Sequence, residues 1–326
     1  MSVRYVLSRV AQTLLVVWLV SVGSYMFLAK SPGDPLRLQS NPEEGSFLTE
    51  QQVQDTRRRL GLDQPVHIQY IQWAARTVSG DWGMSSRTGQ PVLVALRERA
   101  PVTLMLAGLS ATFAIALSVP LGVLAALYRN SWFDRLATVS ALAGVAMPNI
   151  WFGVLLILFF SVTLGWLPPS GYVPFSESPF GSLQRMILPT IVLGTGEMAS
   201  LTRQTRSSML EVLRQDYVRT AQAKGLSQFT VITRHALRNA LLPVVTILGL
   251  RFGSILSGSV ITETIFALPG MGRLAVEGIF LKDYAVTMAF VMMVATLVAV
   301  SNLVTDLAYG LLDPRIQLGH AGGEAG

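Results

Sequence analysis

The chain contains no cysteine among its 326 residues. This absence excludes disulfide bonds, thiolate zinc sites, iron–sulfur clusters and cysteine nucleophiles. Histidine is scarce as well, and His67, His235 and His320 lack the spacing of a metal motif such as HExxH. The nucleophile motif G-x-S-x-G does not occur, and no histidine lies within an apolar run. The sequence therefore predicts no resident cofactor or metal and no enzymatic activity of its own.

Charged side chains are also few. They make up 13% of the residues, whereas soluble domains average about 25%. Hydrophobic residues make up 51% of the chain, and the mean hydropathy is +0.48. The net charge of +6 comes from basic residues that flank apolar runs, which is typical of membrane topology and not of nucleic-acid binding. The composition therefore predicts a membrane protein.

Long apolar runs dominate the sequence, and about 20 apolar residues are enough to cross a bilayer. The run at 187–202 is short, so we expect its helix to continue through Arg203 beyond the membrane. The first run is too long for the core of a signal peptide, and no cleavage site precedes Lys30, so it is expected to remain as a span. An all-α protein with six transmembrane helices follows, with its apolar runs at residues 10–29, 101–128, 136–165, 187–202, 240–262 and 285–312.

The organisation predicted from these runs has four parts. Residues 1–29 form the first transmembrane helix, and residues 30–100 form a polar, proline-containing insertion outside the membrane. Residues 101–312 form a five-helix core, which includes a polar segment at 203–240. Residues 313–326 form a cytoplasmic tail.

The orientation follows from lysine and arginine, which concentrate in short cytoplasmic loops. Loops beyond about 60 residues translocate regardless of charge, so the long insertion contributes only its end next to the second span. The inside set is Arg4, Arg9, Arg129, Arg135, Arg203, Arg206, Arg214, Arg219, Lys224, Arg234, Arg238 and Arg315, against Arg97, Arg99, Arg185, Arg273 and Lys282 outside. Both termini and the 203–240 segment are therefore predicted to be cytoplasmic.

The segment 203–240 contains a short run of small and charged residues. Ala221 and Gly225 are four residues apart and would share one face of a helix, where a partner protein could approach the backbone closely. A glycine at the end of the run suits a helix terminator, and Ser227 suits the cap of a following helix from 228 to about 240. Spacing alone equally fits an ordinary amphipathic connector.

The amino-acid sequence of this segment favours a docking loop over an ordinary connector. Residues 216–226 read Asp-Tyr-Val-Arg-Thr-Ala-Gln-Ala-Lys-Gly-Leu, and residues 235–244 read His-Ala-Leu-Arg-Asn-Ala-Leu-Leu-Pro-Val. This string resembles the cytoplasmic loop of the dipeptide/oligopeptide branch of ABC-importer permeases, the inner-membrane components of binding-protein-dependent transport. It departs from the general importer loop at Arg219, Thr220 and Arg238. Further similarities follow the same order along the chain, at residues 31–35, 60–65, 80–83, 262–272 and 312–315.

This resemblance implies a type I ABC importer permease fold that an ATPase subunit grips through Asp216, Tyr217, Arg219, Thr220, Ala221, Ala223, Lys224, Gly225 and Leu226. It also implies a second homologous permease subunit, two ABC ATPase subunits that carry ATP and magnesium, and an extracytoplasmic binding protein. The expected substrate is a dipeptide or oligopeptide, although the branch also includes permeases for nickel complexes, glutathione and oligosaccharides. The chain has no G-x-x-x-x-G-K-[ST] phosphate loop, in agreement with ATP hydrolysis by partners. A secondary transporter working alone is the alternative of another class, and it would have no use for a docking segment.

Three ionisable residues, Glu197, Arg251 and Asp306, fall inside the predicted spans. Each costs at least about 2.5–3.5 kcal/mol at mid-bilayer, so such residues usually pair or face a wet path. Arg251 is therefore expected either to pair with Glu197 or Asp306, or to line a translocation path with them. A path would suit a zwitterionic peptide.

Overall fold

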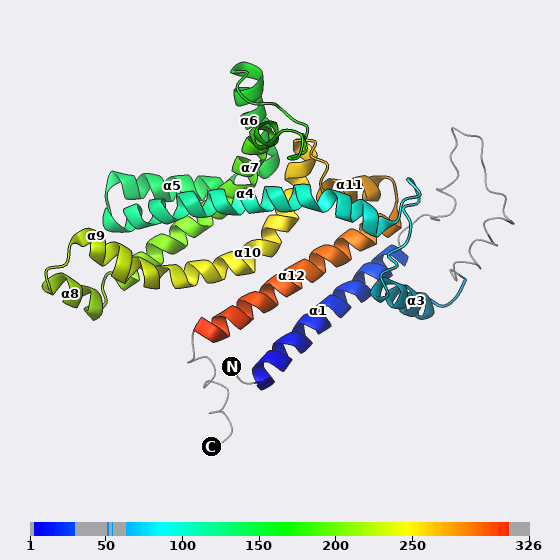
Figure 1. The fold of residues 1–326 in the computed structure, drawn as a ribbon, viewed down its shortest axis with the longest axis horizontal. Helices are drawn as coiled ribbons and strands as arrows, with labels where there is room; N and C mark the ends of the chain where they lie inside the picture. The colour runs from blue at the N-terminus through cyan, green and yellow to red at the C-terminus, as the bar shows by residue number, and fades with distance from the viewer. Residues whose placement is uncertain (1–2, 30–50, 52–53, 55–62, 313–326) are drawn as a thin grey trace.

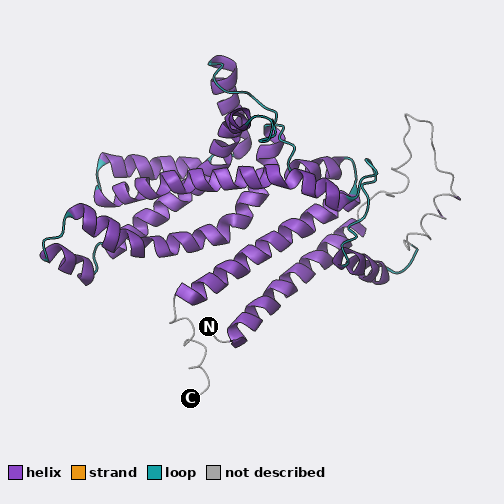
Figure 2. Ribbon diagram, viewed as in Figure 1, coloured by secondary structure: helices purple, strands orange, loops and turns teal. Residues whose placement is uncertain are grey.

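The computed structural model describes residues 3–29, 51, 54 and 63–312, and in these ranges it is built of helices joined by loops (Figures 1 and 2). Most of the predicted insertion up to residue 62 and the tail 313–326 lie outside the described residues. The elements are α1 (Val3–Ala29), α3 (Val66–Val78), α4 (Val92–Leu127), α5 (Trp132–Ala146), α6 (Asn149–Leu156), η2 (Ile157–Thr163), α7 (Pro179–Val212), α8 (Asp216–Ala223), α9 (Gln228–Thr230), η3 (Val231–Ala236), α10 (Leu237–Ile265), α11 (Met271–Phe280) and α12 (Tyr284–Leu312).

Several of these helices are long and apolar enough to cross a membrane. In the described part of the chain four helices qualify by length and composition, and a bent pair, α5 with α6 and η2, brings the number to five if it counts as one span. The sixth predicted span lies in α7, which does not qualify on these criteria. Its apolar run is short and its second half is polar, but its neighbours α4, α5 and α10 cover much of its surface. The surface that α7 buries against these helices does not face lipid, so it does not need to be apolar.

A single helix over residues 136–165 is wrong. The helix ends at Ala146, Pro148 caps the next helix, and the two axes differ by 106°. Proline lacks the N–H that would continue the ladder, and its ring disfavours helical geometry in the residue before it. The run is therefore two short helices with a sharp corner at Met147.

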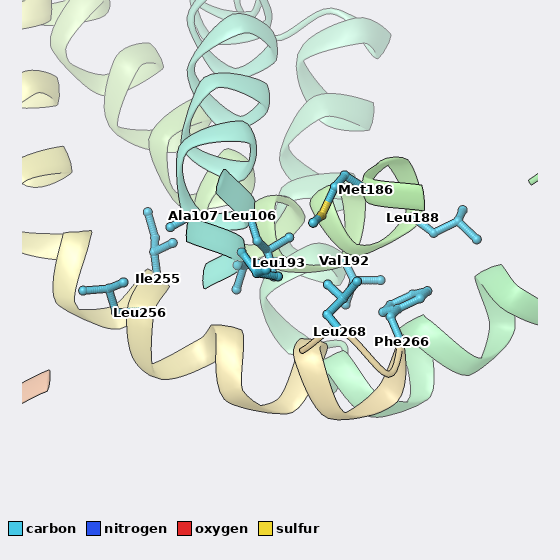
Figure 3. Packing of buried hydrophobic residues seen from close by; sticks show 11 residues of the cluster. Leu106, Ala107, Met186, Leu188, Val192, Leu193, Ile255, Leu256, Phe266 and Leu268 are labelled. Carbon is cyan, nitrogen blue, oxygen red and sulfur yellow. The ribbon is translucent and has the colours of Figure 1, made fainter. Parts of the chain in front are cut away.

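The main hydrophobic core lies where α4, α7 and α10 cross. Figure 3 shows side chains of α4 and α7 meeting those of α10 and of the turn that follows it. Phe266 and Leu268 in that turn are fully buried. The core residues are Val102, Leu106, Ala107, Met186, Leu188, Val192, Leu193, Ile255, Leu256, Phe266 and Leu268.

The long pair α4 and α7 packs through a stripe of small residues. In α4 every fourth residue from 110 to 126 is small, namely Ser110, Ala114, Ser118, Gly122 and Ala126, and each of them is buried. A Cβ added at Gly122 would lie 2.6 Å from the Thr205 Cβ of α7. Small residues at this spacing let membrane helices approach closely, where packing replaces the missing hydrophobic drive.

The helices α10 and α12 cross in the same way. A Cβ added at Gly253 would lie 2.7 Å from a methyl group of Val298, and one added at Gly249 would overlap the Thr305 hydroxyl. The two glycines are four residues apart and so present a bare strip of α10 to α12. Figure 1 shows that α10 bends between its first and second halves, close to these glycines.

Helix α1 packs along α12, and polar contacts join its two ends to the rest of the bundle. Near its start, Arg9 forms an ion pair with Asp306 of α12 at 3.3 Å, and the Tyr5 hydroxyl donates to the Asp306 carbonyl. Near its other end, Ser21 shares a hydrogen bond of 2.8 Å with Tyr70 of α3. Between these contacts α1 runs beside α12 (Figure 1), with one side half-buried and the other exposed.

One end of the bundle is closed by a layer that we call the end cap, made of residues 81–100, α11 and the first turns of α12. Helix α4 begins at Val92, before the apolar run 101–128, and its first turns pack on α11 and α12 in this layer. The Ser85 hydroxyl donates to the buried Asp283 carboxylate at 2.6 Å, which joins the loop before α4 to the start of α12. Figure 1 places α11 at the opposite end of the bundle from α8 and α9.

Candidate functional site

The polar segment at 203–240 contains the end of α7, the short helix α8, a turn, and the start of the continuous helical stretch formed by α9, η3 and α10. The turn after α8 contains Gly225 with φ +79°, a left-handed conformation that glycine adopts without strain. Ser227 caps α9, since its hydroxyl accepts from the backbone N–H of Thr230 at 3.3 Å. The expected glycine turn and serine cap are therefore confirmed. The expected end of the following helix near residue 240 is wrong, because the chain runs without a break from α9 through η3 and α10 to Ile265.

The predicted docking face shared by Ala221 and Gly225 is wrong. Ala221 is 6% exposed and packs with Val218 and Val231 in a small core of this segment. Gly225 lies beyond the end of α8, so the four-residue helical spacing no longer applies to it. Ala221 thus belongs to the inner face of α8, which faces the protein's own chain.

The outer face of α8 and its turn carries the remaining predicted residues. Tyr217 and Leu226 are 41% and 42% exposed, and Phe229, which the sequence analysis did not single out, is 76% exposed. The Tyr217 hydroxyl accepts a hydrogen bond of 2.8 Å from the Asn239 side chain of α10. The other exposed members are Asp216, Arg219, Thr220, Ala223, Lys224 and Gly225. We call Tyr217, Leu226 and Phe229 the apolar tip. The sequence signal for Phe229 was an aromatic residue between the polar residues Gln228 and Thr230.

The segment rests on the ends of the long helices. One buried cluster lies beneath it, formed by Ala126 of α4, Met209 of α7, Ala236 at the end of η3 and Ala240 in the first turn of α10. A hollow of about 430 Å³ lies beside it, lined by Arg129, Ser207, Leu210, Glu211, Arg214 and Gln215. The segment is therefore packed on three helices of the bundle.

A buried ion pair fixes the neighbouring turn between α4 and α5. Arg206 of α7 binds both carboxylate oxygens of Asp134, with its Nη2 at 2.7 Å from Oδ2. Asp134 is 4% exposed and also accepts from the backbone N–H of Asn130. Such a two-pronged arginine–carboxylate contact is strong and directional. It ties this turn to the same helix that leads into α8.

The three ionisable residues predicted inside the spans do not form one cluster. Arg251 of α10 pairs with Glu197 of α7 at 3.3 Å, which confirms one of the two expected pairings. Asp306 pairs instead with Arg9 of α1. The Glu197 side chain is 13% exposed and the Arg251 side chain 42%. That all three line a translocation path stays a prediction.

Within the described ranges no group of three or more His, Asp or Glu residues is placed to hold a metal ion. The candidate site is instead an exposed helical segment packed on the ends of long helices. The sequence model described as "Binding-protein-dependent transport system inner membrane component" matches residues 118–318 of this chain. The model of the N-terminal part of these membrane components matches residues 2–107.

The chain belongs to this permease family.

Similar permeases match it over almost their whole length. The oligopeptide transport system permease protein AppB of Bacillus subtilis (strain 168) is 41% identical over 316 residues, 96% of this chain and 99% of that protein. The glutathione transport system permease protein GsiC of Escherichia coli (strain K12) is 38% identical over 314 residues, 96% of this chain and 99% of that protein. A crystal structure of an amino acid ABC transporter with histidines covers 68% of this chain and 94% of its own, at 16% identity and a TM-score of 0.46. The permease is thus an all-α membrane protein with the type I importer fold that the sequence predicts.

Proposed function

We propose that this permease is the non-catalytic, membrane-spanning subunit of an ATP-driven importer of dipeptides or oligopeptides in the cytoplasmic membrane. It would pair with a second homologous permease, two ATPase subunits that bind ATP and magnesium, and an extracytoplasmic binding protein that delivers the substrate. Membership of the family supports the assignment, as does 41% identity to an oligopeptide permease over nearly the whole chain. Import of glutathione is the second candidate, supported by 38% identity to a glutathione permease.

The apolar tip is the observation that carries the ATPase interaction. Tyr217 and Leu226 are exposed and lie outside the helices that are long and apolar enough to span a membrane, and the exposed Phe229 is the second residue of one of those helices, Gln228–Gly249. Exposed apolar residues rimmed by polar ones mark protein interaction sites, and aromatic side chains dominate the binding energy of such sites. Arg219 and Lys224 beside them supply positive charge.

We call residues 216–230, which comprise α8, its turn and α9, the docking segment. Transport also needs the docking segment and the substrate entrance to lie on opposite sides of the membrane. The docking segment and the end cap lie at opposite ends of the bundle (Figure 1). The Ser21–Tyr70 hydrogen bond holds the second half of α1 against α3, next to the end cap. The Arg9–Asp306 ion pair holds the first residues of α1 against the last turns of α12, away from the end cap. We infer that the segment and both termini are cytoplasmic and that the end cap faces outward.

The ATPase interaction is tested by truncating the apolar tip. Phe229→Ala, alone and with Leu226→Ala, is expected to lower co-purification of the ATPase subunits at least tenfold, since the loss of an aromatic anchor costs about 2 kcal/mol or more. Phe180→Ala is the matched control, because Phe180 is 78% exposed but lies at the start of α7, far from the tip. Unchanged co-purification of the double variant would remove the docking assignment.

A further inference from the structure

Glu263, near the end of α10, is a carboxylate buried at 0% exposure. Its Oε1 accepts from the Thr103 hydroxyl of α4 at 2.7 Å, and its Oε2 accepts from the backbone N–H of Arg273 in the first turn of α11 at 3.0 Å. The Thr103 hydroxyl in turn accepts from the backbone N–H of Met271 at 2.9 Å. One side chain thus joins three helices.

The turn between α10 and α11 is shaped around this carboxylate. A Cβ on Gly270 would overlap the Glu263 carboxyl group, and a Cβ on Gly272 would lie 2.6 Å from the Val260 Cα and 3.0 Å from Oε2. Only bare backbone fits at these two positions. The sequence similarity at residues 262–272 therefore corresponds to one physical unit, a carboxylate and the glycine cradle that encloses it.

The electrostatics of the site explain how an acid can be placed there. An isolated buried carboxylate is very costly unless hydrogen bonds and opposite charge compensate it. The N-terminus of the ten-residue α11 presents to Glu263 the positive end of the helix dipole and N–H groups that have no partner within the helix. A small neutral residue next to the helix start would cap α11 equally well. A glutamate that reaches across from α10 does more, because it binds α11 to α10 and, through Thr103, to α4.

We propose that Glu263 is a positioning residue that transmits movement of the docking segment to the end cap. The inference rests on the proposed function. The docking segment continues through η3 into α10, and the far end of α10 carries Glu263. A shift of α10 that follows ATPase association would therefore carry α11 and the outer end of α4 with it. The end cap would move as one body instead of deforming within itself.

The end cap contains a buried carboxylate of its own, Asp283, which serves as a contrast to Glu263 of α10. Asp283 is 4% exposed, accepts from the Ser85 hydroxyl and caps the start of α12 through the N–H of Val286. Its bonds stay within the cap and do not reach α10. Loss of Asp283 should thus weaken the cap without disconnecting it from α10.

The test uses the complete importer, with both permeases, the ATPases and the binding protein, reconstituted in liposomes with a peptide. In Glu263→Ala the peptide taken up per ATP hydrolysed is expected to fall at least tenfold, while basal hydrolysis stays within about twofold of wild type. Thr103→Val should lower this ratio about threefold. Glu263→Gln should keep part of the uptake per ATP that Glu263→Ala loses, because its amide oxygen can still accept from the Thr103 hydroxyl. Asp283→Asn, the control, should keep the wild-type ratio even where it lowers the melting temperature.

A distance measurement tests directly whether α4 and α11 move together in the end cap. Spin labels on cysteines at Arg97 in α4 and Phe280 in α11, both exposed, should report one narrow distance in resting and ATP-bound wild type. The same labels should give a broadened distribution in Glu263→Ala. If that variant does not fold, Glu263→Gln and Thr103→Val carry both tests.

The possible results distinguish a failure of the role of Glu263 from a failure of the proposed import function. A wild-type ratio in the Glu263 and Thr103 variants, or an equal loss in Asp283→Asn, overturns the role of Glu263 alone. Wild-type importer that shows no ATP-dependent peptide uptake overturns the proposed function instead.

Discussion

Glu197 and Arg251 meet at the crossing of α7 and α10, near the middle of both helices. Either charge alone at that depth would cost at least about 2.5–3.5 kcal/mol. Their ion pair lowers that cost, and the half-exposed guanidinium leaves Arg251 partly accessible. Pairing is therefore the first role that the structure gives these residues, and contact with a passing peptide is a second role that we propose.

The pairing predicts coupling between the two side chains. Glu197→Gln and Arg251→Gln are each expected to destabilise the protein by about 1–3 kcal/mol, and the double variant by less than their sum, with a coupling of at least about 0.5 kcal/mol. Thermal unfolding of the purified variants measures this cycle. Strict additivity would contradict the pairing. If the pair also lines the path, Glu197→Gln should change uptake of charged peptides more than that of neutral ones, at equal protein level.

At the same scale, the sequence predicted the glycine turn and the serine cap of the 203–240 segment but not the orientation of α8. Small residues at 221, 223 and 225 fit more than one exposed face, and an eight-residue helix is too short for its pattern to decide. The deciding contact is Val231, which follows the turn and covers Val218 and Ala221. Such a tertiary contact is not visible in local spacing, and neither was the exposure of Phe229.

At the scale of helices, close approach determines which elements move together. The stripe of small residues on α4 brings its backbone against α7, so the two form one stiff pair beneath the docking segment. Hydropathy does not detect this stripe, because serine, glycine and alanine interrupt the apolar run without ending it.

Two glycines of α4 allow a matched test of that packing. Gly122→Ala is expected to destabilise the protein by about 1–3 kcal/mol, since the new methyl group would press on Thr205 and on the Thr202 carbonyl. Gly108→Ala is the control on the same helix, where a Cβ meets nothing within 4 Å. It should be neutral or stabilise the helix by up to about 1 kcal/mol. Equal melting temperatures of the two variants would argue against a tight α4–α7 contact.

The helices also show where prediction of spans from sequence ends. Apolar runs identified most of the spanning helices, because the bilayer core fixes both their length and their composition. The corner at Met147 was missed because a proline within an apolar run fits a mild kink as well as a bend of 106°. The start of α4 at Val92 was missed because its first turns pack in the end cap and not against lipid.

At the scale of the molecule, the docking segment and the end cap lie at opposite ends of a bundle that naturally lacks cysteine. Single cysteines therefore report topology without background. Ser79→Cys, in the turn after α3, is expected to react with a membrane-impermeant maleimide from outside intact cells. Ser227→Cys, in the docking segment, should react only after the membrane is opened. Labelling of the Ser227 variant in intact cells would reverse the proposed orientation.

The attachment of α1 at its two ends determines how its sequence can change. Between the Arg9–Asp306 contact near one end and the Ser21–Tyr70 contact near the other, one side of α1 packs on α12 and the other side is exposed. Lipid selects for apolarity and not for a particular shape, so leucine, valine and isoleucine should exchange freely on the exposed side of the middle of this helix. The polar residues at its ends have specific partners and should tolerate far less substitution. Among related permeases we therefore expect variation in α1 to be concentrated in its centre, and a substitution at Arg9 to be accompanied by a compensating change at Asp306.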